Sequence, residues 1–594
     1  MRLIAGYATR AREKCSIYVT FPYRQLYVDV IKKLENRFFD KKTKAWEVPF
    51  SDSKKLQDLL EKYNISYDKA AFEKSVKDLN EDMSIEIKKV THDVDISILD
   101  GVKFKTEPRD YQKEGIVFGL LNKQFLLADD MGLGKSFMAL NIARLKKNGK
   151  HCLIICGYAS LQYNWKLEVE KHTNQSAYIL GTRIKPRKKR KYIGTTKDKI
   201  EDLNNLENID EFFIITNINF IRESIKKKYK DKNSKEKTAK QYFVAEKINE
   251  YCKSGVIGRI IFDEFQVAKS IKTDNTKAIL TISDCEYKIA ATGTPIMNNH
   301  AELYPLLKWL GKEPLNYFSF INEYCMLGGC KSQEITGNKN NKKLNYRLSA
   351  FMLRRKKADV LDLPPKNYID MPLLMLPQQE FLYEQTRRML KTDIVAQRGN
   401  KAKVLEMLSV LRKITCSPFW VNEKFTESAK FEKIDELMET IYDNDEKVII
   451  LSNWTTPFTG LKEESLIHRL SDYKPLMITG DLNQEKREYN MKKFQNESEN
   501  KIMLGTYKAM GVGLTLTAAN NVILLDQPWN KAIEDQGVDR AYRFGTTKTV
   551  NIFKLHCADT LDDFVDRLVT LKGRVTAETI DGEIYDELME HVLF

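Results

Sequence analysis

The chain has 594 residues, a formal net charge of +15, 42% hydrophobic residues and 30% charged residues. This composition can bury several cores, which excludes wholesale disorder, and no apolar run approaches the ~20 residues that span a bilayer. Nine cysteines without a CxxC pair support neither a structural zinc site nor a disulfide scaffold. The first residues lack the apolar core of a signal peptide, so we expect a cytoplasmic protein without a membrane partner.

The first hundred residues predict a small α+β unit. SIYVTF (16–21) alternates apolar and polar residues, as a strand with one buried face does. A helix-like stretch follows around residues 24–37. Because this part carries its own apolar pattern, we expect a separate domain over residues 1–95.

Eight short apolar runs follow, and most lead through a small or polar residue into a helix-like stretch. Several are rich in Ile and Val, which is typical of parallel strands buried on both faces. Strands that alternate with helices predict open parallel sheets, here in two groups, 125–293 and 448–526. Residues 294–447 between them predict mostly helices. The runs are FLLAD (125–129), CLIIC (152–156), FFIIT (212–216), RIIFD (259–263), KIAATG (288–293), VIILS (448–452), KIMLG (501–505) and VILLD (522–526).

The segment DDMGLGKS, which begins at Asp129, lies between the first run and a helix-like stretch, the context that a phosphate-binding loop requires. Gly132 and Gly134 permit a tight backbone whose N–H groups face phosphate oxygens. In such a loop Lys135 reaches the β- and γ-phosphates, and the Ser136 hydroxyl binds Mg²⁺. Asp129 stands where the strict pattern has glycine, so a Gly-rich turn before an ordinary helix is the alternative.

Two basic stretches hold most of the excess charge. KPRKKRK (185–191) carries six basic residues and no acid, and KKKYKDKNSKEKTAK (226–240) carries eight basic and two acidic residues. Contact with nucleic-acid phosphates and a solvated surface are both open for these stretches. Because neither has periodic apolar residues, we expect loops at both places.

The run RIIFDEFQ (259–266) is an apolar strand that ends in two carboxylates. Asp263 is suited to hold Mg²⁺, and Glu264 is suited to orient and deprotonate an attacking water. The next run leads into TGTP (292–295), whose hydroxyl groups can link an ATP site to a second site. A plain turn is the alternative for TGTP.

The segment VDRAYRFG (538–545) places Arg540 and Arg543 three residues apart, so a helix would put both on one face. Arginines of this kind stabilise charge on a phosphoryl group in transfer. The preceding residues 501–526 predict a strand, a Gly-rich turn and a second strand. A solvated helix face is the alternative for the arginine pair.

In this order the motifs resemble those of the Snf-type (sucrose non-fermenting) DNA translocases of helicase superfamily two. The resemblance runs from about residue 104 to about residue 572. PRDYQKEGI (108–116) resembles the adenine-contacting motif, and FMLRRKKADVLDLPPK (351–366) resembles the segment that joins the two lobes. The other matching segments begin at residues 153, 215, 408, 447, 480, 505 and 536.

The resemblance implies an α/β fold with two RecA-like parallel-sheet lobes, a helical insertion between them and a small α+β N-terminal domain. We expect lobe 1 over 100–310, the insertion over 311–425 and lobe 2 over 426–594. ATP and Mg²⁺ are the implied cofactors, with Ser136 and Asp263 as Mg²⁺ ligands. The implied catalytic residues are Lys135, Asp263, Glu264, Arg540 and Arg543. The implied ATP-binding residues are Arg109, Gln112, Asp130, Met131, Gly132, Leu133, Gly134, Lys135 and Ser136.

The resemblance also implies a DNA partner, duplex, forked or branched, that is bound by its backbone and not by its base sequence. A monomer is the expected state. The compact chain lacks chromatin-reader modules, so a bacterial or phage source is favoured over a nucleus. The candidate DNA contacts are short polar or stacking residues at strand ends: Thr216, Asn217, Ser452, Asn453, Trp454 and Thr506.

Three positions depart from the family pattern. Gln266 replaces the His that usually ends motif II, and Gln can hydrogen-bond but cannot titrate. Met510 and Thr515 replace the usual Gly and Asn of motif V.

Residues 19–60 are similar to the HARP-type domain (HepA-related protein) of annealing helicases. The similarity consists of Phe-Pro-Tyr, a helix and then Phe39, Asp40, Thr43, Lys44 and Trp46. We expect this unit to select the DNA structure, with the Trp46 ring available to stack on an unpaired base beside lysines. A generic cap with Trp46 in its core is the alternative.

The function that follows is an ATP-driven motor on duplex or forked DNA that anneals strands or remodels branches in replication, recombination or repair. The motor of a defence or restriction system is one alternative, although no HNH or PD-(D/E)xK pattern occurs in the chain. A DNA-binding scaffold with weak ATPase is another, and the intact Lys135, Glu264 and Arg540 argue against it.

Overall fold

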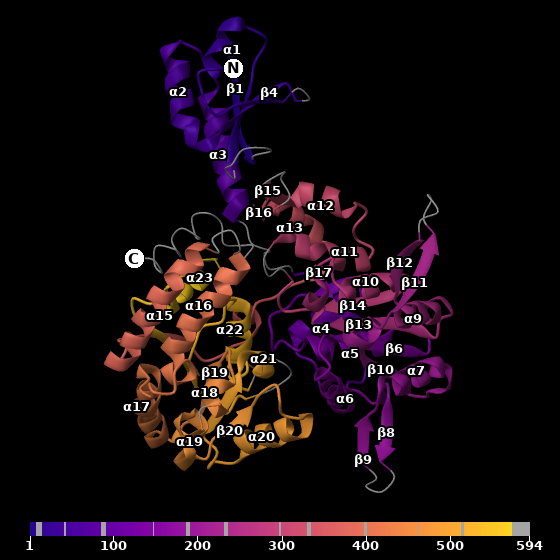
Figure 1. Cartoon of the computed structure of the whole chain (residues 1–594). Helices are drawn as coiled ribbons and strands as arrows, with labels where there is room; N and C mark the ends of the chain where they lie inside the picture. Colours follow the sequence, from indigo (N-terminus) through magenta and orange to yellow (C-terminus); the bar gives the residue numbers. More distant parts are fainter. Residues whose placement is uncertain are drawn as a thin grey trace.

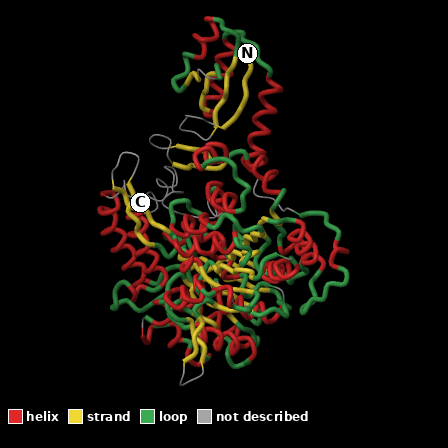
Figure 2. Tube along the Cα trace, turned by 90° about the vertical axis from the view of Figure 1, so that its right-hand side faces the viewer, coloured by secondary structure: helices red, strands yellow, loops and turns green. Residues whose placement is uncertain are grey.

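The computed structural model describes residues 1–7, 15–40, 43–84, 91–146, 148–185, 190–230, 236–295, 299–328, 334–396, 401–460, 462–511, 516–543 and 545–572. Figure 1 shows a small N-terminal unit above two larger lobes that lie beside each other. The view turned by 90° in Figure 2 shows the same separation between the N-terminal unit and the rest of the chain. No helix within the described ranges is long and apolar enough to cross a membrane.

The N-terminal unit is a four-stranded antiparallel sheet covered by helices, with strand order β1-β2-β4-β3. The predicted strand is present, but the predicted helix ends at Ile31 because the chain turns there into β3. Ile17, Val19 and Val48 form part of its buried core. The elements are β1 (Arg2–Tyr7), β2 (Cys15–Thr20), α1 (Gln25–Ile31), β3 (Phe38–Asp40), β4 (Ala45–Pro49), α2 (Ser53–Lys62) and α3 (Lys69–Ser84).

The residues of the HARP-like pattern, from Phe39 to Trp46, lie in the β3–β4 hairpin. Phe39 lies opposite Trp46 in the register, and their ring centroids are 5.1 Å apart. The Thr43 hydroxyl donates a hydrogen bond to Oδ2 of Asp40 at 2.8 Å across the turn. Trp46 is half-buried against the core, so its ring is neither fully free nor fully enclosed.

Lobe 1 contains a seven-stranded parallel sheet with strand order β17-β5-β14-β13-β6-β10-β7. Consecutive residues of β6 belong to different cores, Leu153 to one and Ile154 to the other, because side chains alternate between the faces of a strand. Burial on both faces explains the continuous apolar runs. The strands are β5 (Gln124–Leu127), β6 (His151–Cys156), β7 (Ala177–Ile179), β10 (Phe213–Asn217), β13 (Ile257–Asp263), β14 (Tyr287–Ala291) and β17 (Met352–Leu353).

Lobe 2 contains a six-stranded parallel sheet with strand order β18-β23-β22-β19-β21-β20. All eight apolar runs are strands of these two sheets, which confirms the predicted fold class. Helices α15 (Pro377–Ala396), α16 (Lys401–Cys416), α17 (Ala429–Asp443), α20 (Gln484–Asn496), α22 (Lys531–Val538) and α23 (Leu561–Lys572) belong to this half of the chain. The strands are β18 (Lys366–Leu373), β19 (Val448–Ser452), β20 (Leu476–Ile478), β21 (Ile502–Thr506), β22 (Asn521–Leu524) and β23 (Val550–Cys557).

The middle region 311–425 gives a strand to each sheet. Edge strand β17 pairs with β5 of lobe 1, and β18 pairs with β23 of lobe 2. A connector over residues 354–365 therefore joins the lobes, and we refer to it below by that name. The same region holds α12 (Tyr317–Tyr324), the hairpin β15 (Cys325–Gly328)–β16 (Glu334–Asn338), and α13 (Asn341–Ser349).

The two basic stretches are hairpins, so the prediction of loops is wrong for their described parts. The first stretch overlaps the antiparallel pair β8 (Thr182–Lys185) and β9 (Arg190–Ile193). The second overlaps β11 (Ile225–Lys230) and β12 (Glu236–Gln241). Figure 1 shows both pairs extending from lobe 1. A two-stranded hairpin buries little side-chain surface, so its strands need no apolar periodicity.

The N-terminal unit is joined to lobe 1 through the carboxylate of Asp82 on α3. That carboxylate accepts hydrogen bonds from the backbone N–H groups of Asn341 (3.2 Å) and Lys342 (2.9 Å) at the start of α13. The Tyr7 hydroxyl donates to the same carboxylate at 2.5 Å. One acidic side chain thus caps a helix of lobe 1 and binds a strand of the N-terminal unit.

Candidate nucleotide site between the lobes

The phosphate loop follows β5 and leads directly into α5 (Lys135–Leu145). Gly132 and Gly134 have φ angles of +85° and +82°, in the left-handed region that favours glycine. A Cβ on Gly134 would lie 2.5 Å from Nε2 of Gln112, so a side chain there would displace the Gln112 amide. The first turn of α5 presents backbone N–H groups, which suit phosphate oxygens.

The Lys135 side chain is half-buried, with its amine enclosed by this loop. Nζ donates hydrogen bonds to the backbone oxygens of Asp129 (2.7 Å) and Asp130 (3.2 Å). Burial lowers the pKa of Lys135, and nearby carboxylates, Glu264 foremost, oppose that shift. A buried ammonium group with these partners is suited to a polyphosphate, which would bring further negative charge to it.

Asp263 ends β13 and is held from two sides. Nε1 of Trp165 on α6 (Leu161–His172) donates to its Oδ2 at 2.9 Å, and the Glu264 backbone N–H donates to its Oδ1 at 3.0 Å. Burial and the charge of Glu264 raise the pKa of Asp263 to about 7, although Trp165 and Lys135 oppose the shift. Adjacent carboxylates of this kind suit a hard cation such as Mg²⁺, because Mg²⁺ prefers oxygen ligands.

Glu264 adopts a left-handed backbone conformation, with φ +55° and ψ +49°. This conformation costs a non-glycine residue on the order of 1–3 kcal/mol and persists where the surroundings enforce it. Nε2 of Gln266 donates a hydrogen bond to Oε2 of Glu264. A Cβ on Gly157 would lie 2.9 Å from the Glu264 Cβ, so the end of β6 is packed against this residue. Gln266, the departure from the family pattern, thus orients the Glu264 carboxylate.

Gln112 connects α4 (Asp110–Leu121) to the phosphate loop. Its Oε1 accepts from the Arg109 backbone N–H at 3.1 Å, and its Nε2 donates to the Leu133 carbonyl at 3.3 Å. On the other side, a Cβ on Gly293 would lie 3.0 Å from Cγ of Met131. Gln112 and the TGTP segment therefore lie next to the loop, and the contact of Gln112 with adenine stays a prediction.

Asp129 forms a buried ion pair with Arg355 of the connector, a partner that sequence reasoning missed. Nη2 of Arg355 lies 2.6 Å from Oδ2 of Asp129, and the two side chains are 1% and 0% exposed. The Asp130 backbone N–H also donates to the Arg355 carbonyl at 3.0 Å. The acid that replaces glycine in the strict loop pattern thus ties the loop to the connector. The Arg-Arg pair at 354–355 was the available signal, but it did not identify an acid 226 residues away.

Arg540 and Arg543 do not lie on a helix, so that prediction is wrong. Helix α22 ends at Val538, and the chain then turns. The Thr546 Oγ1 atom lies 2.7 Å from the carbonyl oxygens of Ala541 and Arg543, and this hydroxyl satisfies groups that a continued helix would pair internally.

The turn that carries the two arginines lies against the phosphate loop of the other lobe. Nη2 of Arg540 is 3.8 Å from Sδ of Met131, and a Cβ on Gly132 would lie 3.2 Å from Cβ of Arg543. Burial lowers the pKa of Arg540 to about 10, and the negative charge of Glu264 opposes the shift. The lobes are therefore closed, and basic groups of both lobes meet the carboxylates of lobe 1 at one site.

Four of the six candidate DNA contacts have buried side chains. Thr216, Asn217 and Ser452 are 0%, 3% and 0% exposed, and Thr506 is 7% exposed. Oδ1 of Asn217 accepts from the Phe220 backbone N–H at 3.1 Å, so it caps the short helix after β10. These four side chains are enclosed at the strand ends and do not present a surface.

Asn453 and Trp454 are half-buried after β19. Nδ2 of Asn453 donates to the Gln527 carbonyl at 3.1 Å. The Trp454 ring packs edge-on against Trp420, with centroids 5.1 Å apart, and Arg412 lies 5.6 Å from its centroid. Of the six candidates, only these two retain partly accessible side chains.

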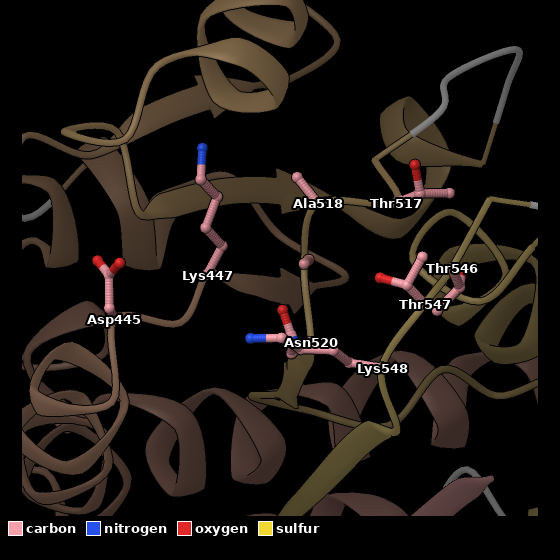
Figure 3. A pocket seen from close by; sticks show the side chains of 9 residues that line it. Asp445, Lys447, Thr517, Ala518, Asn520, Thr546, Thr547 and Lys548 are labelled. Carbon is pink, nitrogen blue, oxygen red and sulfur yellow. The ribbon is translucent and has the colours of Figure 1, made fainter. Parts of the chain in front are cut away.

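Lobe 2 contains two other groups of polar side chains. Asp370, His556 and Asp566 bring ligand atoms within 4.8 Å of one another, but Nζ of Lys554 lies 2.5 Å from Oδ1 of Asp566 and supplies the positive charge there. Lobe 2 also has a hollow of about 230 Å³, and Figure 3 shows the side chains that line it. Its Lys447 amine donates to backbone carbonyls, including that of Glu497 at 2.7 Å. Neither group is assigned a ligand. The hollow is lined by Asp445, Lys447, Thr517, Ala518, Ala519, Asn520, Thr546, Thr547 and Lys548.

Comparison with known proteins gives two family matches. Residues 51–420 match the SNF2-related domain, and residues 429–545 match the helicase conserved C-terminal domain. Both matches agree with the motifs described above.

Named relatives are similar over most of this chain. A putative ATP-dependent helicase/translocase, YwqA, of Bacillus subtilis is 27% identical over 499 residues, which are 81% of this chain and 49% of that protein. The human DNA annealing helicase and endonuclease ZRANB3 is 24% identical over 80% of this chain and 40% of its own length. The chain spans about half the length of the curated relatives it matches. The SWI2/SNF2 ATPase core of Sulfolobus solfataricus in complex with dsDNA is 24% identical, covers 82% of this chain and 97% of its own, and has a TM-score of 0.34.

Proposed function

The chain belongs to the SNF2-related family, and from this premise we propose that it is an ATP-hydrolysing DNA translocase that acts on duplex or forked DNA. One observation carries the proposal: Arg540 of lobe 2 lies at the phosphate loop of lobe 1, with its Nη2 3.8 Å from Sδ of Met131, and Arg543 lies against Gly132 of the same loop. Residues from two lobes that meet at one site suit a motor, because nucleotide can then control the distance between the lobes.

Binding of ATP is assigned to the phosphate loop and its neighbours. Lys135 would bind the β- and γ-phosphates, and the backbone of residues 130–136 would surround them. Gln112 and Arg109 would contact the adenine side. Ser136 and Asp263 would hold Mg²⁺, which supplies positive charge to the phosphates when it is bound.

Hydrolysis is assigned to three side chains. Glu264, oriented by Gln266, would accept a proton from the attacking water. Arg540 and Arg543 would stabilise the charge that develops on the γ-phosphoryl oxygens. Because both arginines belong to lobe 2, hydrolysis would require the closed arrangement of the lobes.

DNA is the proposed partner, bound through its backbone. The net charge of +15 and the two basic hairpins supply the electrostatic attraction, so affinity should fall as salt rises. Asn453 and Trp454 are the side chains proposed to reach DNA, together with backbone groups at the ends of β10 and β21. A monomer is the proposed working state.

The finer proposal is an annealing or branch-remodelling activity with a HARP-like N-terminal domain. The pattern from Phe39 to Trp46 supports it, because that pattern builds a hairpin beside an exposed lysine, Lys44. Lys41 and Lys42 lie outside the described residues. The name of ZRANB3 as an annealing helicase makes the activity a reasonable one to test.

ATP hydrolysis measured with no DNA, single-stranded, duplex and forked DNA tests the proposal. The wild-type rate should rise with duplex or forked DNA. Glu264→Gln and Lys135→Ala should each lower kcat by at least ~10², because both remove a group that acts on the transferring phosphoryl group. Glu264→Gln should still bind ATP.

Glu250→Gln is the matched control, because Glu250 is exposed on α9 (Phe243–Lys253), away from the phosphate loop, and carries the same chemical change. Near-normal turnover in Glu264→Gln would overturn the assignment of the base. A wild-type rate that is unchanged by every DNA substrate would overturn the assignment of DNA as the partner but not the assignment of the ATP site.

A further inference from the structure

Lys357 is fixed to lobe 1 by its backbone, although it belongs to the connector. Its backbone N–H donates to Oδ2 of Asp130 in the phosphate loop at 3.1 Å. Two residues earlier, the Arg355 carbonyl accepts from the Asp130 backbone N–H at 3.0 Å, and the Arg355 side chain pairs with Asp129. The start of the connector therefore moves with the phosphate loop.

The Lys357 side chain binds the other lobe. Its Nζ lies 2.7 Å from Oδ2 of Asp539 and donates to the Tyr542 carbonyl at 3.0 Å. The side chain is only 9% exposed. Asp539 and Tyr542 belong to the turn that carries Arg540 and Arg543. One side chain thus binds this turn at two points, the Asp539 carboxylate and the Tyr542 carbonyl.

The contacts meet at the phosphate loop itself. A Cβ on Gly132 would lie 3.2 Å from Cβ of Arg543 and 3.5 Å from Cε of Lys357. The aliphatic parts of the Lys357 and Arg543 side chains therefore both pack against Gly132. A shift of the Lys357 amine would move the arginine turn relative to the loop.

Asp539 has a second lysine partner that belongs to lobe 2. Nζ of Lys366, the first residue of β18, lies 3.6 Å from its Oδ1. Opening of the lobes would leave Asp539 paired with Lys366 in its own lobe, whereas Lys357 would lose both Asp539 and the Tyr542 carbonyl. The contact between Lys357 and Asp539 is thus made only in the closed state, so it can favour that state over the open one.

We propose that Lys357 is a positioning residue that holds Arg540 and Arg543 over the phosphate loop when the lobes close. The inference deepens the proposed function and rests on it, since it assigns a cause to the closed arrangement in which ATP is hydrolysed. Lys357 acts through the two arginines and is given no contact with the reacting atoms.

The charge of Lys357 depends on pH in an accessible range. Burial lowers the pKa of Lys357 to about 8, with Lys366 and Arg543 acting in the same direction and Asp539 opposing them. Tyr542, whose ring centroid is 5.7 Å from Nζ, is the remaining titratable neighbour on the arginine turn. Above this pKa the amine is neutral and the attraction to Asp539 is lost, so the rate of hydrolysis should fall.

The same deprotonation does not destabilise the fold. The pKa of Lys357 is lower in the folded chain than in the unfolded chain, so between these two values the unfolded chain binds more protons. The contribution of this group to stability therefore increases as pH rises through that window. A rate that falls while the protein stays folded is the expected signature.

Steady-state ATP hydrolysis by wild type, Lys357→Met, Lys357→Arg and Lys356→Met, with and without duplex DNA, tests the inference. Lys356 is the exposed neighbour of Lys357 and provides the matched control. Lys357→Met should lower kcat about tenfold or more with KM for ATP within about twofold, because a buried charge pair is broken while the ATP-binding groups remain. Lys357→Arg should restore much of the rate, and Lys356→Met should match wild type.

The pH profile supplies a readout that uses well-folded proteins. Wild type should lose activity as pH rises through about 8, whereas Lys357→Arg should keep its activity to higher pH because the guanidinium stays charged. Identical alkaline profiles for the two proteins would overturn the inference, even if Lys357→Met does not fold.

A double-variant cycle identifies the partner. If Lys357 acts through Asp539, then Lys357→Met combined with Asp539→Asn should be little slower than the slower single variant. A double variant whose loss of rate equals the product of the two single losses would overturn the pairing. Absence of DNA stimulation in wild type would count against the DNA partner alone, because the kcat, pH and cycle comparisons are also made without DNA.

Discussion

The nucleotide site and the proposed DNA surface differ in how their polar side chains are used. At the nucleotide site, the side chains of Lys135 and Asp263 are half-buried, that of Arg540 is buried, and they converge on the phosphate loop from two lobes. At the strand ends proposed to meet DNA, Thr216 and Ser452 are turned inward. A small ligand must be enclosed by groups that are positioned in advance, whereas a DNA backbone can be bound by any basic surface of suitable shape.

The largest expected effect follows from the convergent site. Arg543→Ala should lower the DNA-stimulated kcat by about 10³, the low end of the range for arginines that stabilise a transferring phosphoryl group. ATP binding should be nearly normal, because the phosphate loop belongs to the other lobe. Single-turnover hydrolysis and nucleotide binding should be measured side by side.

Arg388→Ala, on the exposed side of α15, is the control for loss of one arginine. Full-speed hydrolysis by Arg543→Ala in the presence of DNA would mean that the closed arrangement is not the one that hydrolyses ATP.

An intermediate effect is expected from the N-terminal unit, which lies apart from both regions. Deletion of residues 1–90 should leave ATPase with duplex DNA within about threefold, since every assigned hydrolytic residue lies later in the chain. Preference for forked over duplex DNA, and any strand annealing, should drop. The deletion also removes the Asp82 cap of α13, which costs about 1 kcal/mol of stability, so melting temperatures should accompany the rates.

Asp82→Asn keeps the unit but weakens its junction and the Tyr7 hydrogen bond, so it separates loss of the unit from loss of the cap. A truncated protein that retains its full fork preference would leave the HARP-like proposal without support.

The smallest effect is expected at the strand ends. Thr216 Oγ1 is buried and has no hydrogen-bond partner among the described residues, so Thr216→Val replaces an unsatisfied hydroxyl by a methyl group of similar size. DNA affinity at fixed salt should change by less than about twofold, and stability should not fall.

Trp454→Ala is the informative partner of that experiment, because Trp454 keeps a partly accessible ring at the proposed DNA surface. A large loss of DNA affinity in Thr216→Val would show that DNA reaches the end of β10 after a rearrangement of the lobes.

Local patterns in the sequence were enough for the sheets and for most of the phosphate loop. The eight apolar runs predicted buried parallel strands, because only residues buried on both faces need to be continuously apolar. The two glycines of the loop predicted its turn, and the observed φ values explain why no other residue suits those positions. Both features depend on neighbouring residues alone.

Contacts between distant segments decided the rest. The partner of Asp129 is 226 residues away, and the link from Lys357 to Tyr542 spans 185 residues. The arginine turn ends a helix because Thr546 and the connector bind it, and the basic stretches pair as hairpins despite their charge. Such pairings depend on which segments the two sheets bring together. The pattern of residues along one segment does not identify the distant residues that pack against it.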